Sequence, residues 1–270
     1  MIQAFQDGRI REDDIAVMFS IDGAQLYAQK LSACWIYIWV LLNLSPTRHY
    51  QKKHVLIGGF IPRPNNPKNF NSFLFPGLGH LAAIQKEPIT IWDSALQREV
   101  HSRIFLPLVT ADRPGMMHIT GFMGYHGKHG CRLYCGLSGQ CECQGKHYFP
   151  VLLKPRDYDV EGSSHPDINI RHIREASCKE YKKNLSILVV SLNESQYRVR
   201  RLETGISKLS IFSGIEPSGT LGLPRSTGSD IMHLGTLNIS DLMISLWRGT
   251  IDCTRPVLRS NDLNGATCTV

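Results

Sequence analysis

Two aspartates, Asp22 and Asp112, each close an apolar run of the kind that forms a buried strand. The runs read DIAVMFSID and SRIFLPLVTAD. If the two strands lie side by side in parallel, both carboxylates leave the sheet at the same edge. Paired carboxylates at such an edge can hold divalent metal ions for an in-line attack on a phosphodiester. The simpler alternatives are that Asp22 and Gly23 form a hairpin turn and that Asp112 begins a loop.

A second group of candidate ligands lies in residues 124–150, which read GYHGKHGCRLYCGLSGQCECQGKHYFP. Four of the eight cysteines fall within this segment. Cys131 and Cys135 form one candidate pair of ligands for a structural Zn²⁺, because thiolates and imidazoles are the groups that zinc prefers. The second pair would come from His126, His147, Cys141 and Cys143. The alternative is a loop of free thiols.

The elements that position these residues follow from apolar spacing. We expect strands over residues 14–22, 31–44, 54–61, 89–92 and 102–112. A helix is expected over residues 69–86, with Pro76, Gly77 and Gly79 interrupting its first half. Strands that alternate with helices predict an α/β fold with a mixed sheet flanked by helices.

The second half of the chain predicts helices. Residues 167–208 are expected to be mostly helical, residues 210–229 form a loop, and a last helix covers residues 231–247. Asp230 suits the N-cap of that helix, and His233 is expected to be packed. The apolar residues expected on its buried face are Leu234, Leu237, Leu242, Ile244 and Leu246.

Composition and charge limit the classes of function. Hydrophobic residues make up 42% and charged residues 20%, which is typical of a globular chain. The net charge is +7, and residues 171–208 carry nine Lys and Arg against four Asp and Glu. This balance favours a polyanionic partner, although a solvated helical face is the simpler interpretation. No signal peptide is expected, and the fourteen uncharged residues 31–44 are short for a membrane span of about 20 residues, so we expect an intracellular chain with no membrane partner.

Seven segments, in order, resemble the transposases of the CACTA (En/Spm-type) family of fungal DNA transposons. They are DIAVMFSIDGAQLY, CWIYIWVLLNLSP, VLIGGFIPRPNNPKNFNSFLFPGL, LVTADRPGM, HGKHGCRLYC, GKHYFPVLLKP and DIMHLGTLNISDLMISLWRGT. Together they extend from about residue 14 to residue 252, which is most of the chain.

The resemblance implies a DDE enzyme with an RNase H-like fold. It implies that Asp22 and Asp112 are the first two acids and that both bind Mg²⁺ or Mn²⁺, with a cysteine-containing insertion beyond Asp112. The third acid lies on a late helix in related enzymes, shortly after an Asp-x-Met-His motif. Here Gly235, Thr236 and Leu237 occupy that place. The remaining candidates are Asp230, Asp241 and Asp252, of which we choose Asp230. Arg113 and Gly115 also differ from the small residue and the alanine expected beside the second acid.

These expectations divide the chain into five parts. Residues 1–123 form the first part of the RNase H-like core, 124–150 the zinc insertion, 151–229 a basic helical region and loop, 230–252 a late helix that completes the core, and 253–270 a tail. The expected function is a nuclear DNA transposase that acts on transposon ends and target DNA and assembles as a homo-oligomer. The expected chain is a fragment or a decayed copy with weak cleavage. The alternatives are a catalytically inactive, transposase-derived module that binds DNA or protein, and an unrelated zinc-stabilised structural protein.

Overall fold

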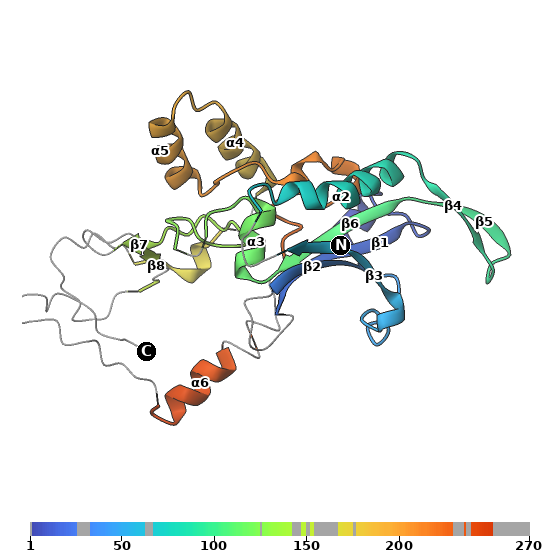
Figure 1. Ribbon diagram of the computed structural model, residues 1–270, viewed down its shortest axis with the longest axis horizontal. Helices are drawn as coiled ribbons and strands as arrows, with labels where there is room; N and C mark the ends of the chain where they lie inside the picture. Colours follow the sequence, from blue (N-terminus) through green and yellow to red (C-terminus); the bar gives the residue numbers. More distant parts are fainter. Residues whose placement is uncertain are drawn as a thin grey trace, which may run out of the picture.

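A four-stranded mixed sheet forms the centre of the computed structural model (Figure 1). The structure describes residues 2–25, 33–62, 67–124, 126–141, 147–149, 152–153, 167–174, 177–228, 235 and 239–250. The strands of the sheet are β1 (Ile15–Gln25), β2 (Ala33–Leu41), β3 (Val55–Pro62) and β6 (Ile104–Ala111), in the order β3-β2-β1-β6. The predicted α/β class and mixed sheet are therefore confirmed.

Strand pairing in this sheet brings together the two runs that precede the candidate acids. β1 pairs with β2 antiparallel, and β2 pairs with β3 antiparallel. β1 pairs with β6 in parallel, with Ile21 opposite Ala111. The predicted parallel neighbourhood of these two strands is confirmed.

One face of the sheet is covered by two helices, α2 (Asn71–Lys86) and α3 (Arg113–Thr120). Phe19 and Trp35 of the sheet are almost fully buried and belong to one core cluster with Leu74 of α2 and Ile119 of α3. Burial of such large apolar side chains is the main stabilising contribution to the fold. The packing of the two helices thus holds β1 and β6 in place near their carboxyl ends.

Three local predictions are corrected. The predicted interruption of α2 is wrong, because the helix continues through Pro76 while Leu74, Leu78 and Leu81 are buried against the sheet. Asp112, which follows β6, does not begin a loop but is the N-cap of α3. The strand predicted over residues 102–112 begins too early, because Ser102 belongs to β5 (Arg98–Ser102) and β6 begins only at Ile104. β5, which was not predicted, forms a hairpin with β4 (Ile89–Asp93).

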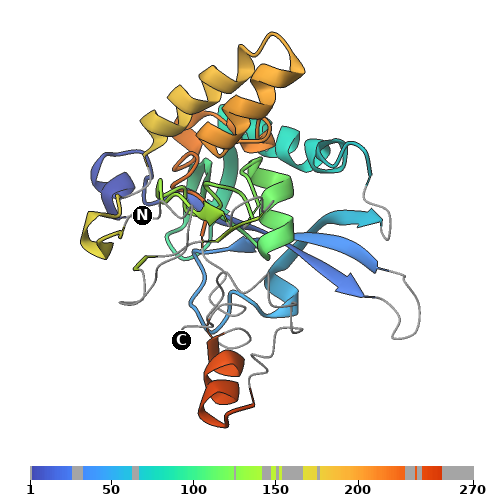
Figure 2. The same cartoon turned by 90° about the vertical axis from the view of Figure 1, so that its left-hand side faces the viewer.

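Beyond the sheet, α4 (Cys178–Val189) and α5 (Glu194–Thr204) form a helical hairpin, seen well in Figure 2. Tyr181 and Leu188 of α4 are buried in the main core cluster. The helical prediction for this region is confirmed over these two helices. The short remaining elements are α1 (Ile2–Gln6), β7 (Gln140–Cys141), β8 (Tyr148–Phe149) and the 3-10 turns η1 (Lys52–His54), η2 (Ile170–His172), η3 (Ile211–Gly214) and η4 (Pro217–Gly219).

The last described helix is α6 (Ser240–Trp247), and it buries none of its side chains. The predicted buried face is therefore wrong for Leu242 and Ile244, which are 58% and 43% exposed. Leu234 and Leu237, like His233 and residues 253–270, lie outside the described residues. None of the helices within the described ranges is long and apolar enough to cross a membrane.

Candidate functional site

Asp22 lies in the last third of β1. The strand continues to Gln25, and Asp22 is paired with Ile36 of β2. The hairpin-turn interpretation of Asp22 and Gly23 is therefore wrong. The side chain is exposed, and its Oδ1 accepts a hydrogen bond of 2.7 Å from the Gly23 amide. An exposed carboxylate at this position is open to a ligand from solvent.

Asp112 follows β6 directly and is the N-cap of α3. Its Oδ1 accepts a 2.7 Å hydrogen bond from the Gly115 amide, which satisfies one of the free donors of the first helical turn. A Cβ atom at Gly115 would lie 2.8 Å from this oxygen and 3.1 Å from the Trp35 ring. The glycine found in place of the expected alanine therefore has a physical reason, since a methyl group would press on the carboxylate.

Asp22 and Asp112 occupy corresponding positions on neighbouring strands. Each comes one residue after the paired residues Ile21 and Ala111, and parallel pairing gives both strand ends the same direction. The two acids therefore lie at the same level of the sheet, although β1 continues past Asp22 to Gln25 whereas β6 ends just before Asp112.

Asp230, the chosen third acid, lies outside the described residues, as does Asp252. The chain just before it is described, and it runs along the free side of β6. The Val109 amide donates to the Ser226 carbonyl at 2.7 Å, and the Gly228 amide donates to the Val109 carbonyl at 3.1 Å. Gly228 thus brings the chain to the same strand two residues before Asp230. Asp241, the other candidate, is exposed on α6.

Arg132 is a residue of this edge that sequence reasoning missed. Its Nη2 donates to the Ala111 carbonyl at 2.8 Å and to the Gly228 carbonyl at 2.9 Å. The guanidinium therefore joins the end of β6 to the segment that leads to Asp230. No spacing signal marks Arg132, because its partners are backbone carbonyls far away in the sequence.

Cys131 and Cys135 are hydrogen-bonded to each other through their thiols. The hydrogen bond from Cys135 lowers the pKa of Cys131 to about 6, and the same bond raises the pKa of Cys135. The rings of His126 and His147 lie with centroids 4.4 Å apart. The first predicted pair of zinc ligands, Cys131 and Cys135, therefore lies together, and so do two of the four candidates for the second pair, His126 and His147. These donor types fit zinc.

Within the described part of the chain, however, no three His, Cys, Asp or Glu side chains form a group that could hold a metal ion. Cys143 lies outside that part. The zinc site stays a prediction.

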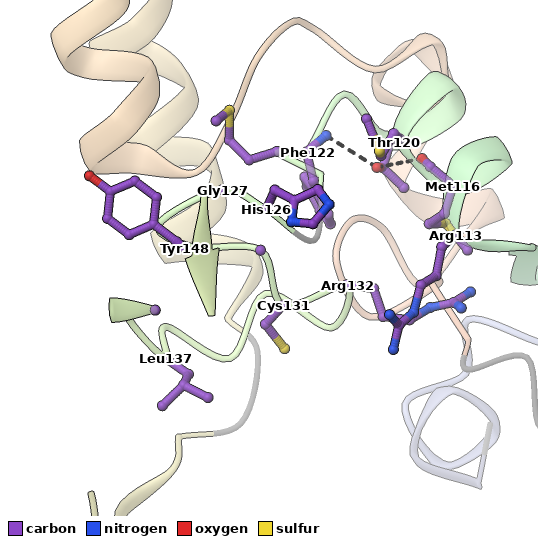
Figure 3. Close-up of a pocket in the computed structure, with 14 residues that line it drawn as sticks. Arg113, Met116, Thr120, Phe122, His126, Gly127, Cys131, Arg132, Leu137 and Tyr148 are labelled. Carbon is purple, nitrogen blue, oxygen red and sulfur yellow. Dashed lines mark hydrogen bonds between the residues drawn. The ribbon is translucent and has the colours of Figure 1, made fainter. Parts of the chain in front are cut away.

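A cavity of about 510 Å³ separates α3 from the segment that carries Cys131 (Figure 3). Its walls include Met116, Met117, Phe122, Met123, His126 and Tyr148. Arg113 and Arg132 line the end of the cavity away from Tyr148 in Figure 3. The Thr120 hydroxyl donates to the Met116 carbonyl at 2.7 Å and accepts from the Phe122 amide at 3.2 Å, which fixes the turn at the end of α3.

Two kinds of charge therefore meet at the end of β6. Carboxylates are ligands for hard divalent cations, and guanidinium groups bind phosphate oxygens.

Neither protein-family models nor curated proteins give a match to this chain.

Proposed function

We propose that this chain is the catalytic region of a DDE-type DNA transposase with an RNase H-like core, as its resemblance to the CACTA family implies. The observation that carries the proposal is the parallel pairing of β1 with β6, in which Asp22 and Asp112 each follow the paired residues Ile21 and Ala111. The resemblance requires the first acid on the first strand and the second acid after the fourth core strand. In the main sheet, β1 is first and β6 is fourth along the chain.

The acid pair fits a divalent cation such as Mg²⁺ or Mn²⁺. Asp22 is exposed and Asp112 is half-buried, so both carboxylates have access to solvent. Of two cations held there, one would activate water, or later the 3′-hydroxyl, and the other would stabilise the leaving oxygen. Asp230 is the proposed third ligand, because the described chain approaches β6 up to Gly228.

Zn²⁺ is proposed as a structural ion, held by Cys131 and Cys135 with His126 or His147. Its role would be to hold the segment that contains Arg132 at the end of β6.

Transposon ends and target DNA are the proposed partners, and the exposed lysines and arginines of α4 and α5 would contact their phosphates. Action on DNA implies a nuclear protein.

A second function is a catalytically inactive module that binds DNA. It is favoured because both acids accept hydrogen bonds from backbone amides. Asp112 caps α3, and Asp22 accepts from the next amide. Gly235, Thr236 and Leu237 stand where related enzymes have an acid. We therefore expect weak or absent cleavage by this chain alone, with DNA binding retained.

Mn²⁺ binding tests the acid pair independently of cleavage. Free Mn²⁺ is measured by electron paramagnetic resonance for the wild type, Asp22→Asn, Asp112→Asn and, as a control, Glu99→Gln on the exposed surface of β5. The wild type and the control should bind equally, and each aspartate variant should bind at least about tenfold more weakly, because it loses a charged ligand. Equal binding by all four proteins would contradict a metal site at this edge.

A cleavage assay on DNA of the transposon ends, with Mg²⁺ or Mn²⁺, separates the two functions. Robust cutting that Asp22→Asn abolishes would show that a third carboxylate completes the site. Cutting that survives Asp22→Asn would contradict the proposed mechanism. Absence of both cutting and DNA binding would contradict the transposase and the inactive module alike.

A further inference from the structure

The cavity beside α3 has walls suited to a flat apolar group. Three methionines, Met116, Met117 and Met123, line it together with Phe122 and Tyr148. Thioether and aromatic side chains adapt to planar rings and make favourable contacts with them. The volume of about 510 Å³ lies within the range of roughly 300 to 1,000 Å³ that is usual for small-molecule sites.

The cationic end of the cavity adjoins the acid edge. Arg113 follows Asp112 in the chain, and Arg132 is bonded to the Ala111 carbonyl just before it. An occupant with one apolar planar part and one anionic part would match both ends of the cavity. A nucleotide has this combination, since its base stacks on apolar side chains and its phosphate pairs with arginine.

We propose that this cavity receives an unpaired nucleobase of the DNA strand that lies at Asp22 and Asp112, with a neighbouring phosphate held by Arg113 and Arg132. The inference rests on the proposed function, because it requires a DNA strand at the acid edge. Arg113, the residue after Asp112, lines the cavity, so a strand whose phosphodiester lies at Asp112 would have a base close to the cavity. The site would hold a single-stranded end in place while leaving the base sequence largely unread, because stacking accepts every base.

The methionine methyl groups provide a direct test. The protein is labelled with ¹³C at the methionine methyl groups, and its spectrum is recorded while a short single-stranded DNA is added. Signals of Met116, Met117 and Met123 should shift, and the signal of Met18, which is buried in β1, should stay in place. An oligonucleotide of equal length with abasic sites should bind with little change at the three cavity methionines. Inorganic phosphate alone should not reproduce their shifts.

A matched pair of variants tests the same site by affinity. Met117 lines the cavity and is 38% exposed. Leu133 is 42% exposed and does not line this cavity. Met117→Trp fills the cavity and should weaken single-stranded DNA binding about tenfold, which is the scale of one lost stacking contact. Leu133→Trp introduces the same side chain and should leave the affinity within about twofold of the wild type.

The outcomes separate this inference from the function on which it rests. Equal methionine shifts with normal and abasic DNA, or with phosphate alone, would overturn the base site and leave the transposase proposal standing. Equal affinities of Met117→Trp and wild type would do the same. Failure of both oligonucleotides and of duplex DNA to bind, measured by fluorescence anisotropy, would overturn the proposed function together with the base site.

Discussion

Single residues hold the candidate site together, and Arg132 connects two segments that are far apart in the sequence. It joins a cysteine-rich segment to the end of β6 and to Gly228 through two hydrogen bonds. Replacing it with methionine keeps the length of the side chain but leaves both carbonyls without this donor. We expect Arg132→Met to lower the free energy of unfolding by about 3 kcal/mol or more, since each of the two hydrogen bonds to this charged group is worth about 1.5 to 3 kcal/mol. Urea unfolding measures this change.

Arg98 provides the control for that measurement. Its Nη2 lies 2.7 Å from Asp13 Oδ1, in an ion pair whose two side chains are both well exposed. Arg98→Met should cost less than about 1 kcal/mol, because solvent screens exposed ion pairs. Equal losses for the two variants would show that Arg132 contributes no more than a surface arginine.

Cys131 gives a prediction in pH. The hydrogen bond from Cys135 lowers the pKa of Cys131 to about 6. In zinc-free protein, the thiolate is therefore present above about pH 6, and the rate of alkylation of Cys131 by iodoacetamide should rise through pH 6 and level off near pH 7. Cys135→Ala removes the donor and should move this rise toward the ordinary thiol pKa of 9.0. Mass spectrometry of the alkylated peptide follows the rate, and an unchanged profile in the variant would contradict the role of Cys135.

The sequence was sufficient to predict that Asp112 follows a strand, but it ended the first strand too early and did not mark Arg132. Asp22 and Asp112 both end apolar runs, yet β1 continues past Asp22 to Gln25. Arg132 receives its role from carbonyls 21 and 96 residues away along the chain. Such a contact depends on tertiary packing and leaves no periodic signal.

At the scale of elements, the start of α3 separates two roles of Asp112. Its carboxylate caps the helix through the Gly115 amide, and the same group is the proposed metal ligand. Asparagine caps helices about as well as aspartate, so Asp112→Asn should keep stability within about 0.5 kcal/mol of the wild type while losing Mn²⁺. Asp112→Ala loses the cap as well and should be less stable by about 1 kcal/mol. Thermal or urea unfolding of the two variants is measured beside the Mn²⁺ titration. Equal stabilities of Asp112→Asn and Asp112→Ala would contradict a capping role that is separate from metal binding.

The elements also show where sequence patterns fail. Pro76 predicted a break in the helix, yet α2 runs from Asn71 to Lys86 because Leu74, Leu78 and Leu81 pack on the sheet. Packing of this kind outweighs the local cost of a proline, which is about 3 kcal/mol in a helix interior. The pattern for α3 was present in the sequence, since Asp112 precedes a proline in the first turn, which is typical of a helix start. An apolar pattern likewise predicted a buried face for α6, but the described residues of that helix bury none of it.

At the scale of the whole molecule, positive charge is concentrated in residues 171–208, which include the helical hairpin of α4 and α5. Residues 171–208 hold nine Lys and Arg against four acids, and Lys179, Lys182 and Lys183 of α4 are exposed. A second pair of adjacent exposed lysines, Lys52 and Lys53, lies on η1 at the other end of the sheet from α4 (Figure 1). The chain therefore offers two equal charge changes at two distant surfaces.

These two lysine pairs test whether DNA lies along α4. Binding of duplex DNA is measured by fluorescence anisotropy over a series of salt concentrations. Affinity of the wild type should fall steeply with salt, because each phosphate contact releases a counterion. Replacing Lys182 and Lys183 by glutamine should reduce the slope of log K against log salt by about 0.9 for each lost phosphate contact. The same change at Lys52 and Lys53 alters the net charge equally but should leave the slope unchanged. Equal reductions for the two pairs would mean that net charge alone attracts the DNA, and α4 would then have no special part in binding it.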